Sequence, residues 1–84
     1  MSTTHRLSFL LADADAHETA ARLREMKVVT ALLCGWRAPV TIAIDAALAG
    51  GSAAVALREI DALPALRRRR VLSCIGALMK GARQ

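Results

Sequence analysis

Residues 39–64, with the sequence PVTIAIDAALAGGSAAVALREIDALP, carry the strongest structural signal in the chain. On both sides of the Gly50-Gly51-Ser52 turn, apolar residues recur roughly every three to four positions, the spacing of one face of an α-helix. Pro39 suits the first turn of a helix, and the glycine pair favours a left-handed C-cap. The stretch therefore predicts two antiparallel helices, over residues 39–49 and 53–63, joined by a tight turn.

A longer helix is predicted before this pair, over residues 16–34. It follows Asp15, a typical N-cap residue with Glu18 three positions later, and it ends at Gly35. Its second half, from Val28 to Cys34, is apolar on all sides. Such a segment is expected to be enclosed by neighbouring elements on several sides.

Two further helices are predicted at the ends of the chain. Residues 65–80 follow Pro64 and carry an apolar stripe, and residues 3–12 place three leucines on one face. We therefore expect residues 1–84 to form one all-α domain of about five short helices, packed as antiparallel helical hairpins.

The composition predicts a thin core. Hydrophobic residues make up 55% of the 84 residues, but Phe9 and Trp36 are the only aromatic residues. Alanine and leucine favour helices, and alanine adds little core volume. A chain of this length buries only about 60–65% of the surface that its unfolded form exposes. We therefore expect it to expose apolar surface meant for a partner, and to be oligomeric or poorly behaved alone.

Cysteine usage and the N-terminal residues bear on the cellular compartment. Cys34 and Cys74 form no CxxC pair, and each lies in an apolar helical segment, which predicts buried thiols in a reducing compartment. No secretory signal pattern is recognisable at the start of the chain. Residues 38–57 are apolar, but they contain Asp45 and a Gly-Gly break, which disfavour a membrane span. A cytoplasmic protein is expected.

Residue patterns that support catalysis are missing from the sequence. Neither His5 nor His17 has a nucleophile or carboxylate at motif spacing. Asp13 and Asp15 are two carboxylates without further ligands, so turn and cap roles are favoured over a metal site. We predict that the protein is not an enzyme and binds no cofactor or metal.

The charge distribution is uneven along the chain. The net charge is +5, and the whole excess lies from Arg58 onward. It is concentrated in four consecutive arginines, residues 67–70, which fan around the helix axis because successive residues turn by about 100°. Arg67 and Arg70 return to similar sides and are the candidates for contact with an anionic partner. A solvated helix end, an acidic protein surface and nucleic acid all remain open interpretations.

Short sequence matches point to a family. Gly51–Leu57 resembles the middle of a tetratricopeptide repeat (TPR), with Ala56 at the small position five residues after the turn glycine. His17–Ala20, Leu72–Cys74 and Pro64 match in addition. Over roughly residues 17–80 the chain resembles the TPR-like chaperones of type III secretion needle subunits, the YscG, EscG and SsaH group.

The resemblance implies a function in protein transport. Members of this group keep a polymerising needle subunit soluble before export, with the client's amphipathic C-terminal helix in a concave groove and a second small helical co-chaperone bound. Transferred to this chain, the groove would be lined by Thr41, Asp45, Leu48, Val71, Ile75 and Leu78. The co-chaperone would contact Leu7, Leu10 and Leu11.

Alternatives to this interpretation stay open. Each of these leucines, valines and isoleucines is also compatible with an ordinary core position. A small basic nucleic-acid-binding protein that uses the arginine run is the second functional hypothesis. A membrane-associated protein centred on residues 38–57 is the third.

Overall fold

The computed structural model describes residues 8–11 and 14–82, and over these residues the chain is helical without strands. It contains a one-turn 3₁₀ helix, η1, and four α-helices. Their bounds are η1 Ser8–Leu11, α1 Ala16–Cys34, α2 Pro39–Leu48, α3 Ala53–Asp61 and α4 Ala65–Ala82. The predicted all-α class is confirmed, and so are the four helices predicted from residue 16 onward, within one or two residues at most ends.

The predicted N-terminal helix over residues 3–12 needs correction. Only η1, with four residues, is present in the described part of that segment, and residues 3–7 and 12 lie outside it. A single turn makes few intrahelical hydrogen bonds to offset the cost of helix nucleation. The described chain therefore has four α-helices where five helices were expected.

Two predicted helix caps are present in the structure. The Asp15 carboxylate accepts a hydrogen bond of 2.8 Å from the Glu18 backbone N–H, as expected for an N-cap. At the end of α2, Gly51 N–H donates to the Ala46 carbonyl and Gly50 N–H to the Ala47 carbonyl, which is a Schellman motif. Gly50 has a φ of +107°, a conformation that favours glycine. These caps set the ends of the first hairpin.

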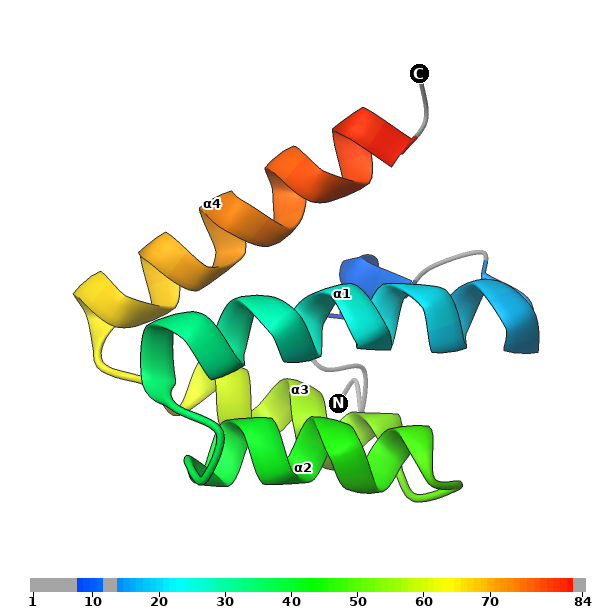
Figure 1. The fold of residues 1–84 in the computed structure, drawn as a ribbon, viewed down its shortest axis with the longest axis horizontal. Coiled ribbons are helices and arrows are strands. Elements are labelled where there is room, and N and C mark those ends of the chain that lie inside the picture. Colours follow the sequence, from blue (N-terminus) through cyan, green and yellow to red (C-terminus); the bar gives the residue numbers. More distant parts are fainter. Residues whose placement is uncertain (1–7, 12–13, 83–84) are drawn as a thin grey trace, which may run out of the picture.

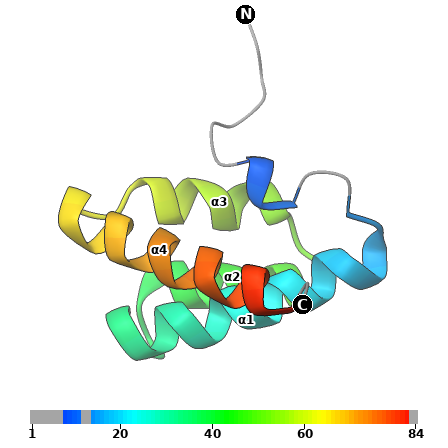
Figure 2. The ribbon, with the colours of Figure 1, turned by 90° about the horizontal axis from the view of Figure 1, so that it is seen from above.

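Helix α1 is the centre of the fold (Figure 1). It packs against α2 on one side and α4 on the other, while α3 packs on α2. Both α2 and α4 run antiparallel to α1, and α4 diverges from it toward the C-terminus. Figure 2, in which the molecule is seen from above, shows α4 lying over the other helices, on the side of α1 that faces away from α2. As a result the C-terminal end of α1 and the N-terminal ends of α2 and α4 lie at the same end of the molecule.

The core lies where the four helices and η1 face one another. Its largest fully buried side chains are Met26, Ile44, Ile60 and Ile75, one from each α-helix. Thr41 is also buried, and its hydroxyl donates a 2.8 Å hydrogen bond to the Gly35 carbonyl, which ties α2 to the turn before it. The remaining core side chains are Leu10, Leu23, Val29, Val40, Ala47, Ala56, Leu57 and Val71.

Candidate protein-interaction surface

The six residues predicted to line a partner groove do not form one surface. Thr41, Val71 and Ile75 are buried in the chain's own core, with at most 1% of each residue exposed. The core interpretation is therefore the right one for these three. The expected groove between α2 and α4 is not formed, because both helices pack on α1, which lies between them in Figure 1.

The other three groove candidates are at the surface, in separate places. Asp45 is exposed on α2, where its carboxylate forms a 2.7 Å ion pair with the Lys27 ammonium group of α1. Leu48 lies at the end of α2 and is partly buried in a small hollow of about 290 Å³ between α1 and α2. Leu78 is 45% exposed on the diverging half of α4.

The residues predicted to contact a second partner are mainly internal. Leu10 is buried in the core, and Leu11 packs partly buried against it. The Leu10 carbonyl accepts a hydrogen bond of 3.3 Å from the Arg22 guanidinium of α1, which holds η1 on the bundle. Leu7 lies outside the described residues. For Leu10 the core interpretation again applies.

Exposed apolar side chains gather instead at the end of the molecule where α1 ends and α2 and α4 begin. Leu32 and Leu66 are the most exposed, at 77% and 78%, and Trp36 is 65% exposed. We call these three residues, together with Val28 on α1 and Ile42 on α2, which are about half exposed, the apolar end, because all five belong to the second half of α1, the turn after it, or the first turn of α2 or α4. Burial of large apolar side chains is favourable by about 1.5–3 kcal/mol each, so this surface is suited to a partner.

The sequence contained a signal for part of this surface. Residues 28–34 are apolar on all sides and were predicted to be enclosed by neighbouring elements. The structure corrects this, because Val28 and Leu32 point to the side of α1 that no described element covers. An apolar segment that the chain itself does not cover is the pattern expected of a binding helix.

Trp36 is held in place by a neighbouring cation. The Lys27 ammonium group lies 5.8 Å from the centroid of the Trp36 ring, within the range of a cation–π contact. The same ammonium group pairs with Asp45. This short network links α1, α2 and the turn between them.

The four consecutive arginines fall into two pairs with different contacts. Arg67 donates a 3.1 Å hydrogen bond to the Leu33 carbonyl in the last turn of α1. Arg68 donates a 2.9 Å bond to the Asp61 carbonyl and lies 3.9 Å from the Asp61 carboxylate. Both satisfy acceptors at helix ends that have no intrahelical donor. Arg69 and Arg70 are exposed and form no hydrogen bond or ion pair with the described residues.

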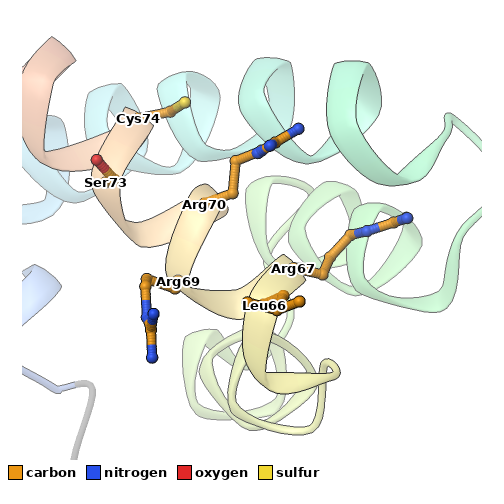
Figure 3. A pocket seen from close by; sticks show the side chains of 6 residues that line it. All are labelled: Leu66, Arg67, Arg69, Arg70, Ser73 and Cys74. Atoms are coloured by element: carbon orange, nitrogen blue, oxygen red, sulfur yellow. The ribbon is translucent and has the colours of Figure 1, made fainter.

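Three of the four arginines, Arg67, Arg69 and Arg70, line an open hollow of about 570 Å³ on α4 (Figure 3). Leu66 lies between Arg69 on one side and Arg67 on the other, and Arg70 and Cys74 lean toward α1. Both predicted anion contacts are exposed, but Arg67 is engaged by the Leu33 carbonyl, while Arg70 has no acceptor among the described residues. Arg69, which the sequence reasoning did not select, is exposed as well.

The cysteine prediction holds for only one residue. Cys34 is partly buried, whereas Cys74 is exposed and lines the hollow on α4, which corrects the expectation of two buried thiols. Among the described residues, no three histidine, cysteine, aspartate or glutamate side chains are close enough to hold a metal ion. None of the described helices has the length and apolar character that a membrane crossing requires.

Comparisons of this chain with models of protein families, with curated proteins and with solved structures returned no match. The resemblance to secretion chaperones therefore remains a prediction from short sequence matches.

Proposed function

We propose that this protein is a non-enzymatic binding module, a chaperone or adaptor that holds an amphipathic helix of a partner protein on its apolar end. The observation that carries the proposal is the exposure of Leu32, Leu66 and Trp36 on three elements that meet at one end of the fold. A helix that docks by apolar side chains at i, i+3, i+4 and i+7 would cover this surface.

The supporting elements give this surface a fixed shape. Arg67 joins the first turn of α4 to the last turn of α1 through the Leu33 carbonyl, so that Leu66 and Leu32 are carried by two connected helices. Trp36 is positioned by Lys27. A preformed surface loses less conformational entropy on binding than a mobile one does. The type III secretion needle subunit is the client that the sequence resemblance suggests.

Nucleic acid is the less favoured partner for a structural reason. Tight, salt-dependent binding to nucleic acid commonly neutralises about 6–10 phosphates. Here Arg67 and Arg68 already bind acceptors of the chain itself, and Arg69 and Arg70 are the members of the run without an acceptor among the residues that the structure describes. The exposed leucines and tryptophan match an apolar partner better.

The proposal is tested by selection of binders from a display library of tryptophan-free amphipathic helices of about 18 residues, or about 27 Å. Binding of the selected peptides is measured through Trp36, the single tryptophan of the chain. We expect its emission to shift to shorter wavelength when a peptide covers the indole.

The control variants separate the apolar end from other exposed leucines. The double substitution Leu32→Ser and Leu66→Ser should weaken peptide binding at least about tenfold, as removal of central apolar contacts does at other interfaces. Leu78→Ser, on the far half of α4, should leave it unchanged. A library without any binder, or binding that depends on Leu78 and not on Leu32 and Leu66, would contradict the proposal.

A further inference from the structure

The surroundings of Leu66 combine apolar and cationic groups in a way that the function proposed above does not require. Leu66 is 78% exposed, and Figure 3 shows Arg69 on one side of it and Arg67 and Arg70 on the other. Ser73 continues the same face about two turns after Leu66. An apolar contact with cations on both flanks selects for charge as well as hydrophobicity.

Two of these cations are available to a partner. Arg67 is engaged by the Leu33 carbonyl and Arg68 by Asp61. Arg69 and Arg70 have no acceptor in the described part of the chain, although adjacent like charges repel each other. Carboxylates brought by a partner would relieve this repulsion and would form charge-assisted hydrogen bonds with the guanidinium groups.

We propose that the partner helix is acidic, with an apolar side chain that packs on Leu66 and carboxylates on the adjacent turns that pair with Arg69 and Arg70. Such pairs at the rim of an interface favour the correct partner and speed its association. This inference rests on the proposed function, because Leu66 belongs to the apolar end. It goes further by assigning the recognition of charge to Arg69 and Arg70, and a structural role to Arg67 and Arg68.

The same residues fit other anionic partners less well. The apolar residues of a helix lying on a membrane surface form a continuous stripe along its axis. On the outer face of α4, however, Leu66 is followed by Arg69, Arg70 and Ser73. A phosphate backbone offers no apolar contact for Leu66. An acidic amphipathic helix supplies both kinds of contact at once.

The test is a second display library, in which the positions flanking the apolar anchors of each helix are Glu, Gln or Lys with equal frequency. When the library is selected for binding to the intact chain, we expect the selected helices to be enriched in Glu at these positions. Against the double variant Arg69→Gln and Arg70→Gln, the apolar anchors should still be selected, while the preference for Glu should disappear.

Peptides of matched sequence measure how much the flanking carboxylates add to the affinity. A Glu-flanked peptide should bind about three- to tenfold more tightly than its Gln-flanked counterpart, since exposed ion pairs each contribute little. The advantage should shrink as NaCl rises from about 0.05 M to about 0.5 M, because salt screens exposed charges. Arg58→Gln, which removes an exposed arginine of α3, serves as the control and should leave the advantage unchanged.

The outcomes separate the two proposals. Selection of apolar anchors without a preference for Glu would overturn the acidic-partner inference and leave the proposed function standing. Failure to select any helix would overturn both. Tighter binding of a 20-base-pair DNA duplex, or of phosphatidylserine vesicles, in competition with the Glu-flanked peptide would also overturn the inference and would identify the anionic partner as nucleic acid or membrane.

Discussion

The region where α1 and α4 pack together and the apolar end are both built from apolar residues, but they differ in exposure. On the packed sides of these two helices, Met26 of α1 and Val71 and Ile75 of α4 are completely buried. At the apolar end, Leu32 and Leu66, on the same two helices, are more than three-quarters exposed. The difference shows that α1 has apolar residues on more sides than the described chain covers, so that one side builds the core and another stays exposed.

Ile75→Ala is expected to have the largest effect on stability. The side chain is fully buried, and its truncation leaves a cavity in the core, which commonly costs about 2–5 kcal/mol. We expect a loss of free energy of unfolding in this range, measured by urea denaturation followed by circular dichroism at 222 nm. A loss below about 1 kcal/mol would show that α4 is not firmly packed on α1.

The substitution Thr41→Val tests whether Thr41, which was predicted to line a partner groove, stabilises the fold instead. Valine preserves the shape of the buried side chain but removes the hydroxyl that donates to the Gly35 carbonyl. We expect a loss of about 1 kcal/mol in the free energy of unfolding and no change in peptide affinity. An unchanged stability with weaker peptide binding would return Thr41 to the partner site.

Arg67→Gln and Arg69→Gln form a matched pair within one run. Because Arg67 holds the last turn of α1 and Arg69 has no acceptor in the described chain, the two substitutions should differ. We expect Arg67→Gln to lower the free energy of unfolding by about 0.5–1.5 kcal/mol. Arg69→Gln should change it by less than about 0.5 kcal/mol. Equal effects in thermal or urea unfolding would remove the distinction between the pairs.

Leu66→Ser should have the smallest effect on stability. The side chain is mostly exposed, and surface substitutions of this kind usually change stability by less than about 0.5 kcal/mol. The same variant should weaken peptide binding, which Trp36 fluorescence measures. A large destabilisation would mean that Leu66 packs within the fold and is not presented to a partner.

Local signals in the sequence predicted the helices well. Asp15, Gly35, Pro39 and the Gly-Gly pair mark helix ends because capping and backbone conformation depend on a few neighbouring residues. The α-helices from residue 16 onward were therefore predictable. The segment around Leu10 was not, because its single 3₁₀ turn is held by tertiary packing and by Arg22.

The candidate site was harder to predict than the helices. Apolar periodicity identifies a helix face, but it does not tell whether another helix of the same chain covers that face. Val71 and Leu66 are both apolar residues of α4, yet one is fully buried and the other is not. Likewise, helical spacing grouped Arg67 with Arg70, whereas the positions of the Leu33 and Asp61 carbonyls group Arg67 with Arg68.

Peptide affinity of the Leu32→Ser and Leu66→Ser double variant, measured beside that of Leu78→Ser, tests the central claim most directly. If the apolar end is the binding surface, circular dichroism shows that the double variant is folded, and this variant binds the peptide at least about tenfold more weakly. Leu78→Ser binds the peptide as the intact chain does. A folded double variant with undiminished affinity would contradict the account.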